Sequence, residues 1–429
     1  MNFHEMGLMP EMIRNLDAMG YVEATPIQEQ AIPFLMSGRD LLGCAQTGTG
    51  KTAAFALPII QKLVKEPTKG RRRIRTLVLA PTRELALQIN DCFREYAKHS
   101  GLRSLVVFGG VSQSMQVKGL REGIDILVAT PGRLLDLMNQ GFIALNEVKY
   151  FVLDEADRML DMGMIQDVRR IVAALPEKRQ TMFFSATMPS EIEELSTSIL
   201  SNPHFIEIAA RSSAAETVNQ SVFRVDKRNK LSLLIHLLQD EGIDSALVFS
   251  RTKHGADKIV SALEKSGLSA QSIHGNKSQS ARQNALNNFK RRKTRILVAT
   301  DIAARGIDVA ELSHVFQFDL PEVPETYVHR IGRTGRAGLG GTAIAFCGED
   351  EYTLLRGVQK LIGKDLYIES EHPFPMQSPE VPMKRAQPFR GQRQDQGRSH
   401  GFRPNNRAGG RPSNRGKAPR SKHAFASKD

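Results

Sequence analysis

The segment AQTGTGKT, from Ala45 to Thr52, has the residue types and spacing of a loop that binds phosphate groups. It follows the apolar run DLLGC and precedes a stretch with helical periodicity. Backbone N–H groups at a glycine-rich turn that opens a helix point toward phosphate oxygens. Lys51 adds positive charge for the β and γ phosphates, and the Thr52 hydroxyl suits Mg²⁺. Because Ala45 stands where the common pattern has glycine, a turn that binds nothing is the alternative. The predicted phosphate-binding residues are Ala45, Gln46, Thr47, Gly48, Thr49, Gly50, Lys51 and Thr52.

The acidic pair in VLDEAD, Asp154 and Glu155, is the second candidate for chemistry. It follows a strongly apolar run, and ligands of open α/β sheets bind beyond the carboxyl ends of the strands. A carboxylate there holds Mg²⁺ directly or through water, and its neighbour orients the attacking water or accepts its proton. We therefore assign Asp154 to the metal and Glu155 to the water. Acids that only start a solvated helix are the alternative, which the Lys51 loop in the same predicted domain disfavours.

Short β-rich apolar runs alternate with helical stretches, which is typical of a parallel sheet buried on both faces. The pattern occurs twice, and the small polar segment AARSSAAETVNQS separates the two copies. We therefore expect an α/β fold with two tandem parallel-sheet domains, at residues 1–208 and 222–372, joined by a linker at 209–221. The expected strands lie within 75–80, 104–110, 125–130, 150–156 and 181–187 of the first domain, and within 221–225, 245–250, 269–275, 294–300, 314–320 and 341–347 of the second.

The positive charge of the chain is concentrated at its C-terminal end. The whole sequence has 59 Lys and Arg against 46 Asp and Glu, a net charge of +13. Residues 384–429 hold 13 basic and 2 acidic residues, or +11, which leaves 46 basic and 44 acidic residues, or +2, for residues 1–383. Residues 373–429 are rich in Gly, Pro, Arg, Asn, Gln and Ser, with too few apolar side chains to offset chain entropy. We expect a near-neutral body with a disordered basic tail at 373–429.

The composition excludes several classes of protein. With 429 residues, of which 41% are hydrophobic, the chain can build two or three domains with substantial cores. It has no run of 18 apolar residues, and its first ten residues include one acid, Glu5, and no Lys or Arg, so we expect no membrane span, no secretion signal and a cytoplasmic location. Cys44, Cys92 and Cys347 stand far apart without a CxxC spacing, which argues against a disulfide framework or a zinc site and for free, reduced thiols.

Ten short segments stand out along the chain: GYVEATPIQ (20–28), AQTGTGKT (45–52), PTREL (81–85), GG (109–110), TPGR (130–133), DEAD (154–157), SAT (185–187), LVFSRT (247–252), ATDIAARGIDV (299–309) and HRIGRTGR (329–336). With these segments in this order, the chain resembles the DEAD-box ATP-dependent RNA helicases from about residue 3 to residue 365. The resemblance implies two RecA-like domains, with a first segment that recognises the base within residues 1–29. Tyr21 stands where the family often has Phe, and Ala24 where Pro is frequent.

The resemblance implies that ATP and Mg²⁺ are the cofactors and assigns base recognition to Gln28 and Tyr21. The Gln28 amide has a donor and an acceptor in one plane, which match the N6 amino group and N7 of adenine and mismatch guanine. Tyr21 would stack on the adenine ring. Phe3 either supports that pocket or belongs to the ordinary core.

In the second domain, Arg333 and Arg336 resemble the arginine fingers of the family, which reach the γ phosphate when the two domains close. Guanidinium groups on the transferring phosphoryl oxygens stabilise the charge of the transition state. Asp308, in RGID, resembles the residue that bonds the ribose. An arginine-rich surface turn is the alternative for HRIGRTGR taken alone.

The resemblance also places RNA along both domains. Glycines and threonines there permit close approach to phosphates and sugar hydroxyls and read few base edges, so we expect sequence-independent binding, with RNA preferred over DNA by resemblance alone. The implied RNA-binding residues are Pro81, Thr82, Arg83, Glu84, Gly109, Gly110, Thr130, Pro131, Gly132, Arg133, Arg251, Gly275, Thr300 and Asp301.

Two further segments have weaker assignments. Ser185 and Thr187 resemble the element that couples hydrolysis to unwinding, and a capping Ser or Thr is the alternative. In the tail, arginines alternate with Gly, Asn and the aromatic residues Phe389 and Phe402, a composition that suits phosphates and stacked bases. We expect the tail to anchor RNA, and a protein docking site or a solubilising extension are the alternatives.

Together these patterns predict an ATP-dependent RNA helicase that separates short duplexes locally or remodels RNA–protein complexes. An ATP-gated RNA clamp or ribonucleoprotein scaffold is the main rival, and a DNA-directed motor of the same superfamily is a third possibility. Family members with short cores and basic tails resemble bacterial proteins that act on ribosome assembly, RNA decay or cold-stressed transcripts, so ribosomal or RNA-decay complexes are the expected partners.

Overall fold

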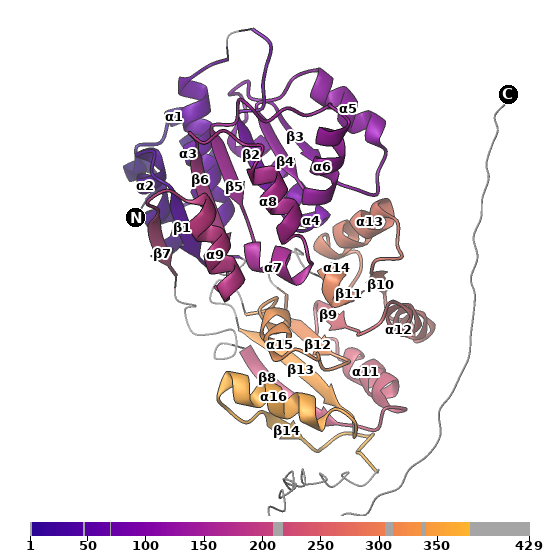
Figure 1. The fold of residues 1–429 in the computed structure, drawn as a ribbon. Coiled ribbons are helices and arrows are strands. Elements are labelled where there is room, and N and C mark those ends of the chain that lie inside the picture. The colour runs from indigo at the N-terminus through magenta and orange to yellow at the C-terminus, as the bar shows by residue number, and fades with distance from the viewer. Residues whose placement is uncertain are drawn as a thin grey trace, which may run out of the picture. The chain divides into compact units, whose positions relative to one another are not determined.

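The computed structural model describes residues 2–45, 48–68, 70–208, 218–304, 312–335 and 340–377 (Figure 1). Both predicted domains are present as parallel sheets with helices on their faces, which confirms the expected fold class. Among the described residues, no helix is long and apolar enough to cross a membrane. All three cysteines are free thiols, as expected.

The first sheet has seven described strands in the order β3-β4-β2-β5-β6-β1-β7, and all neighbouring strands in it are parallel. Its strands are β1 (Leu41–Cys44), β2 (Thr76–Leu79), β3 (Ser104–Val107), β4 (Ile126–Ala129), β5 (Tyr150–Leu153), β6 (Gln180–Ser185) and β7 (His204–Glu207). Its helices are η1 (Phe3–Met6), α1 (Pro10–Ala18), α2 (Pro26–Met36), α3 (Lys51–Lys65), α4 (Arg83–Tyr96), α5 (Gln113–Arg121), α6 (Pro131–Asn139), α7 (Ala156–Asp161), α8 (Ile165–Val172) and α9 (Ser190–Ile199).

The second sheet repeats this strand order as β10-β11-β9-β12-β13-β8-β14, again with parallel pairings. Each of its strands therefore has a counterpart seven strands earlier in the chain. The strands are β8 (Val218–Arg224), β9 (Ala246–Phe249), β10 (Ala270–Ile273), β11 (Ile296–Ala299), β12 (His314–Gln317), β13 (Gly341–Cys347) and β14 (Tyr367–Glu369). The helices are α11 (Lys230–Leu238), α12 (Lys253–Lys265), α13 (Gln279–Lys290), α14 (Asp301–Ala304), α15 (Pro324–Ile331) and α16 (Tyr352–Ile362).

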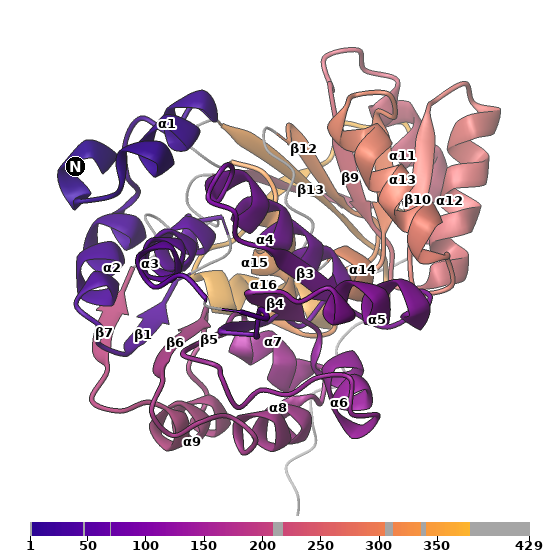
Figure 2. The ribbon, with the colours of Figure 1, turned by 90° about the horizontal axis from the view of Figure 1, so that it is seen from above.

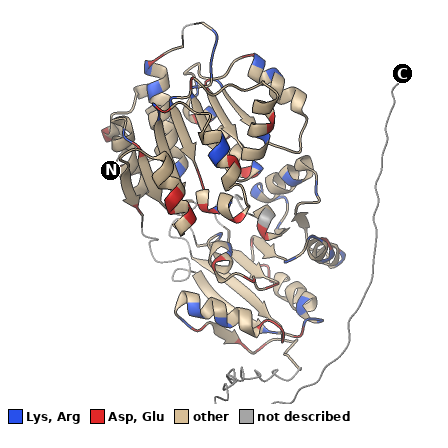
Figure 3. Cartoon of the chain, in the orientation of Figure 1, with Lys and Arg blue, Asp and Glu red and all other residues tan. Residues whose placement is uncertain are grey.

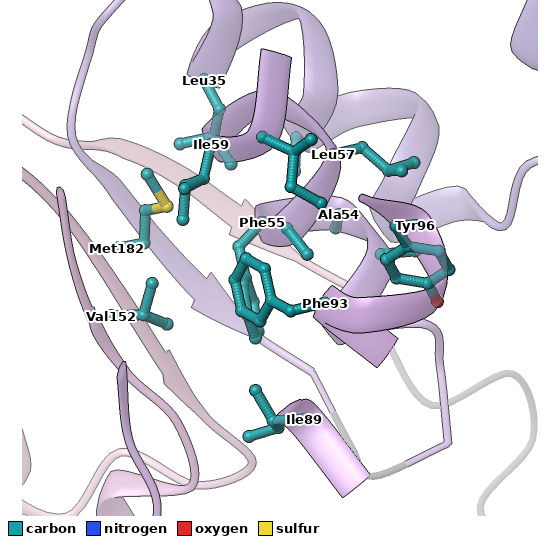
Figure 4. Close-up of a cluster of buried hydrophobic side chains, with 14 of the residues drawn as sticks. Leu35, Ala54, Phe55, Leu57, Ile59, Ile89, Phe93, Tyr96, Val152 and Met182 are labelled. Carbon is teal, nitrogen blue, oxygen red and sulfur yellow. The ribbon is translucent and has the colours of Figure 1, made fainter. Parts of the chain in front are cut away.

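Each sheet is buried on both faces. Successive strand residues point to opposite sides, so they belong to different core clusters. Along β6, Met182 and Phe184 belong to the cluster formed with α3 and α4, whereas Phe183 belongs to the cluster formed with α8 and α9. Figure 2 shows α2, α3 and α4 on one side of the first sheet and α8 and α9 on the other. In the first cluster the rings of Phe55 and Phe93 lie side by side, with centroids 6.1 Å apart (Figure 4).

Two domain boundaries differ from the sequence-based expectation. Strand β8 begins at Val218, so residues 218–221 are strand rather than linker, and Val218, Gln220 and Val222 alternate as buried residues along it. Residues 373–377, expected in the tail, contact the second domain: Phe374 packs against its core, and the Gln377 amide N–H donates to Asp226 Oδ2 at 3.2 Å. The rest of the expected linker, 209–217, and of the expected tail, 378–429, lies outside the described residues.

Charges of both signs are spread over the helices of the described body, in agreement with its small net charge (Figure 3). One carboxylate is fully buried at the amino end of the first sheet. Asp125, directly before β4, pairs with Arg75 Nη2 at 2.8 Å and with Arg72, and it accepts the Arg103 amide N–H at 3.0 Å. Burial alone would raise the pKa of Asp125, but these hydrogen bonds together hold the pKa below its ordinary value.

We predict that Asp125→Asn lowers the free energy of unfolding by about 3 kcal/mol, because it leaves the buried guanidinium of Arg75 without a carboxylate. The native pKa of Asp125 lies below the unfolded value of about 3.9. The contribution of this carboxylate to the free energy of unfolding is therefore complete at pH values above about 3.9, and it is lost as the pH falls through the native pKa. Chemical denaturation at neutral and acid pH measures both effects.

The matched control is Glu66→Gln, which makes the same chemical change in the exposed pair that Glu66 forms with Lys149. It should cost less than about 1 kcal/mol. Equal losses for the two variants would contradict the role of Asp125.

Candidate functional site

The loop predicted to bind phosphate joins β1 to α3 through glycines with left-handed backbones. Gly48 has φ 88° and Gly50 has φ 95°, a region that favours glycine over residues with a Cβ. A Cβ atom on Gly50 would lie 2.5 Å from Gln28 Nε2 and 2.8 Å from Thr25 Oγ1. Gly50 is therefore required both by its backbone and by the close packing of α2. Gln46 and Thr47 lie outside the described residues.

Lys51 opens α3 with its ammonium group turned back to the loop. Its Nζ donates to the Ala45 carbonyl at 3.0 Å and lies 3.5 Å from Asp154 Oδ1. Both side chains are almost fully buried, with 5% and 3% of their surface exposed. The structure thus brings together the two charged groups that the sequence assigned to phosphate and to metal. Thr52, the next residue of α3, is half-buried.

Asp154 is the first residue beyond β5, at the carboxyl end of the sheet. Its Oδ1 atom is buried and accepts no hydrogen bond. Burial raises the pKa of Asp154, and the charge of Lys51 opposes that rise. A buried carboxylate oxygen without a hydrogen bond is suited to a hard cation, since Mg²⁺ prefers oxygen ligands. The donor set of Asp154 and Thr52 therefore fits Mg²⁺.

Glu155 has a left-handed backbone, with φ 55° and ψ 52°. For a residue with a side chain this costs of the order of 1 kcal/mol, and such strain occurs often at functional sites. Its carboxylate Oε2 accepts from Arg158 Nη1 at 2.6 Å, one turn along α7. Arg158 was not among the predicted site residues, and it orients the acid assigned to the water.

Asp157 is the second residue that sequence reasoning missed. Its Oδ2 atom accepts from the Ala186 amide at 3.2 Å, the Thr187 amide at 3.1 Å and the Thr187 hydroxyl at 3.1 Å. Ser185 Oγ accepts from the Asp157 amide at 3.2 Å and donates to the Thr187 carbonyl at 2.7 Å. These bonds tie the start of α7 to Ser185 and to the segment after β6, and Ser185 accepts an amide N–H of the first turn of α7. The signal was present as the last letter of DEAD.

Gln28 is buried, with 2% of its surface exposed, at the start of α2. Its Oε1 accepts from the Thr25 amide at 2.9 Å, and its Nε2 donates to the Gly50 carbonyl at 3.1 Å. The residue assigned to the base is thus bonded directly to the phosphate-binding loop. Tyr21 is half-buried, and its ring meets Phe3 edge-on at 6.2 Å. Phe3 itself is 1% exposed and part of the core.

A groove collects many of the residues expected to bind RNA. It contains backbone and small side chains of the first domain beside arginines, and Arg83 also packs its guanidinium against Gly110. Thr82 caps α4 by accepting from the Leu85 amide at 3.2 Å. The lining residues are Pro81, Thr82, Arg83, Glu84, Gly109, Thr130, Gly132, Arg133, Asp136, Met162, Met164, Gly275 and Arg282.

Glu84, which lines this groove, contacts two residues of the second domain. Its carboxylate accepts from Arg282 at 2.7 Å and from Gln279 Nε2 at 3.2 Å, both on α13. Arg282 and Gln279 lie outside the motif segments, so no motif indicates them.

Arg251 and Thr300 are not among the groove residues that the structure describes. The Arg251 guanidinium donates to Glu351 Oε1 and to the Leu320 carbonyl, both at 3.2 Å. Glu351 also binds the buried Lys230 at 2.6 Å. Arg251 is therefore held by an ion-pair network of the second domain, and its assignment to RNA stays a prediction.

The segment HRIGRTGR contributes an anchor as well as a candidate finger. Arg330 is 3% exposed and forms a two-bond pair with Asp301, at 2.6 and 2.9 Å. A crevice beside it is lined by Arg333 and His329 together with Arg158 of α7. Burial and then the charge of Arg158 lower the pKa of His329, which favours its neutral form. Arg336 and Asp308 lie outside the described residues.

Two family models match this chain, one in each of its two domains. Residues 25–195 match the family model described as DEAD/DEAH box helicase, and residues 229–338 match that of the helicase conserved C-terminal domain. An ATP-dependent RNA helicase CshA of Listeria monocytogenes is 42% identical over 362 residues, 84% of this chain and 69% of that protein. The Bacillus subtilis DEAD-box ATP-dependent RNA helicase CshA is 40% identical over 358 residues, 83% of this chain and 72% of that protein.

The chain belongs to the DEAD-box ATP-dependent RNA helicases. The fold of this helicase is similar to S. cerevisiae Dbp5 bound to RNA and ADP BeF3, with a TM-score of 0.74, 31% identity and coverage of 86% of this chain and 95% of that one. A DEAD box protein of Methanococcus jannaschii is 39% identical, with a TM-score of 0.52 over 86% of this chain and 99% of that one. The prediction of two RecA-like domains and of ATP-dependent RNA helicase activity is confirmed, and the rival clamp is not favoured.

We predict that Gly50→Ala raises the dissociation constant of this helicase for ATP at least tenfold, because the new Cβ displaces Gln28 from the loop. Isothermal titration with ATP measures the effect, and thermal unfolding monitors folding.

The matched control is Gly141→Ala. Gly141 also has a left-handed backbone, with φ 74°, but a Cβ there meets no heavy atom within 4 Å. It carries the backbone cost alone, of about 1 kcal/mol. A similar loss of ATP affinity in both variants would show that close packing at Gly50 is unimportant.

Proposed function

We propose that this helicase hydrolyses ATP at the site formed by Lys51, Asp154 and Glu155, and that RNA in the groove beside Thr82, Thr130 and Arg133 stimulates turnover. The observation that carries the proposal is the buried pair of Lys51 and Asp154, 3.5 Å apart at the carboxyl end of the parallel sheet. A buried ion pair is costly to maintain without further partners. ATP phosphates would supply such partners to Lys51.

Within this proposal Thr52 and Asp154 hold Mg²⁺, which when bound neutralises phosphate charge. Lys51 binds the phosphates, and loop amides from Ala45 to Gly50 cradle them. Glu155, oriented by Arg158, accepts a hydrogen bond from the attacking water. Arg333 stabilises the charge that develops on the transferred group. Arg336 and Asp308 join this site on the strength of the motif resemblance.

Base recognition in the proposal uses Gln28 and Tyr21. The bond from Gln28 to the Gly50 carbonyl supports this role, because it links the adenine site to the phosphate loop. An amide has two N–H donors and two acceptor lone pairs, so the two bonds that Gln28 makes leave capacity for a base.

The proposed RNA contacts run along the sugar–phosphate backbone. The groove supports this, since Thr82, Thr130 and Gly109 present hydroxyl and backbone groups, and Arg83 and Arg133 add positive charge. Recognition of the 2′-hydroxyl would favour RNA over DNA. Ser185 and Thr187 are proposed to couple ATP hydrolysis to unwinding of RNA in this groove, through their hydrogen bonds with Asp157. Ribosomal or RNA-decay complexes stay the proposed partners, and the cytoplasm the proposed location.

We predict that Glu155→Gln lowers kcat for RNA-stimulated ATP hydrolysis about 100-fold or more, while ATP and RNA affinities change little. Lys51→Ala should instead lose ATP binding. Steady-state ATPase assays with RNA, with equal single-stranded DNA and without nucleic acid measure these effects. The control Glu177→Gln changes an exposed acid and should leave turnover unchanged. Normal turnover by Glu155→Gln would reject its role, and equal stimulation by DNA would reject the preference for RNA.

For the tail, we predict that deleting residues 378–429 weakens RNA binding and flattens its salt dependence, because the 13 basic residues of 384–429 are lost. Truncation after Gln377 keeps the contacts that Phe374 and Gln377 make with the body. Fluorescence anisotropy over a range of salt concentrations measures the slope. A full-length variant with the tail Lys and Arg changed to Gln should behave like the truncation. An unchanged slope in both would show that the tail is no electrostatic anchor.

A further inference from the structure

Tyr21 is held by two aromatic rings and one hydrogen bond. Phe3 and Tyr96 both meet its ring edge-on, with centroids 6.2 and 6.0 Å away and interplanar angles of 63° and 86°. The hydroxyl groups of Tyr21 and Tyr96 lie 3.0 Å apart, within hydrogen-bond distance. Edge-on neighbours and a bond at the ring tip together restrict how the Tyr21 ring can tilt.

The partner in this bond, Tyr96, is the last residue of α4 and is 2% exposed. Figure 4 shows its side chain among those of the first core cluster. Burial raises the pKa of Tyr96, with further contributions from Cys92 and from Tyr21, so the phenol stays neutral. A buried hydroxyl needs a hydrogen-bond partner, since leaving it unpaired costs free energy. Tyr21 provides one.

The backbone around Tyr21 is fastened to the same end of α4. Asn15, on α1, donates through Nδ2 to the carbonyls of Tyr96 and Lys98, both at 3.1 Å. Carbonyls at a helix C-terminus lack intrahelical partners, so these bonds satisfy groups that would otherwise need water. An isolated antiparallel bridge between Asn2 and Glu23 closes the segment. The segment that carries Tyr21 is thus anchored to the C-terminal end of α4.

The two tyrosines form a matched pair in the sequence. Phenylalanine, the frequent residue of the family at position 21, would leave the buried Tyr96 hydroxyl without the bond to Tyr21. Phenylalanine at position 96 would remove the partner of the Tyr21 hydroxyl. The consequences of losing either hydroxyl should therefore be coupled.

We propose that Tyr96 is a positioning residue for ATP: its hydroxyl fixes the Tyr21 ring in the orientation that stacks on adenine, without Tyr96 touching the nucleotide. The inference rests on the proposed stacking role of Tyr21. It deepens that function by assigning part of the base affinity to a side chain at the far end of α4 from the groove residues Thr82 and Arg83.

A double-mutant cycle tests the proposal, with Tyr21→Phe, Tyr96→Phe and the double variant in the full-length protein. Isothermal titration gives the dissociation constant for ATP, and RNA-stimulated turnover gives KM and kcat. Each single variant should raise the dissociation constant and KM about three- to tenfold, with kcat changed less than twofold. The double variant should be no weaker than the weaker single one. Effects that multiply would show independent hydroxyls and overturn the proposal.

Inorganic triphosphate separates positioning of the base from damage to the site, because it has phosphates but no ring. Its inhibition constant should be the same in Tyr96→Phe and in the unmodified protein. If Tyr96→Phe weakens the binding of triphosphate and of ATP equally, the proposal is overturned. A partly unfolded variant would give this same result. Tyr150→Phe, which removes another buried phenol of the same domain, should leave ATP affinity unchanged.

Tyr21→Ala distinguishes this inference from the function on which it rests. Loss of a base stack should weaken ATP binding at least tenfold. If Tyr21→Ala weakens ATP and Tyr96→Phe does not, the stacking role stands and the positioning role is wrong. If Tyr21→Ala binds ATP normally, the stacking role is wrong and the inference falls with it.

Discussion

The parallel pairing of the central strands is the constraint on which the nucleotide site depends. In the first sheet Leu79 pairs with Leu153, Leu153 with Phe183, and Cys44 with Ser185. Because all these strands run in one direction, the residues that follow them meet at one edge. Segments more than a hundred residues apart in the chain thus place Lys51 and Asp154 within 3.5 Å. An antiparallel neighbour would have sent one of these segments to the opposite edge.

The same pairing explains which elements could be predicted from the sequence. Central strands such as β2, β4, β5, β9 and β11 are buried throughout, so their sequences are continuous apolar runs that stand out. The edge strands β7 and β14 were not foreseen. Each is short and largely exposed, with Phe205 53% and Tyr367 67% exposed, so an apolar run is absent. The start of β8 was missed because Asn219, Gln220 and Ser221 interrupt its apolar pattern.

For the proposed site, the motifs predict residues but not the partners of those residues. Local spacing indicated Lys51, Asp154 and Glu155, and the family resemblance indicated Gln28. Neither predicted that Arg158 binds Glu155, that Arg330 binds Asp301 or that Tyr96 bonds Tyr21. The contacts of Arg330 with Asp301 and of Tyr96 with Tyr21 join positions 29 and 75 residues apart, so they depend on how the chain packs. Arg158 lies only three residues after Glu155, and the helical spacing of the two residues was the available signal. The repeat of the fold was visible as a second series of alternating strands and helices, but the order of the strands within each sheet was not predicted.

The carboxylate of Asp157 has a consequence for sequence variation in related chains. One of its oxygens accepts from two backbone amides and one hydroxyl of the segment after β6. A neutral histidine has a single acceptor nitrogen and a larger ring, so it could not replace that oxygen bond for bond. Chains that spell this motif DEAH must hold the corresponding segment with different donors and acceptors. The residue at the fourth position of the motif therefore helps to hold the segment after β6 against α7. It can vary between chains without a change in the two acids at the first and second positions.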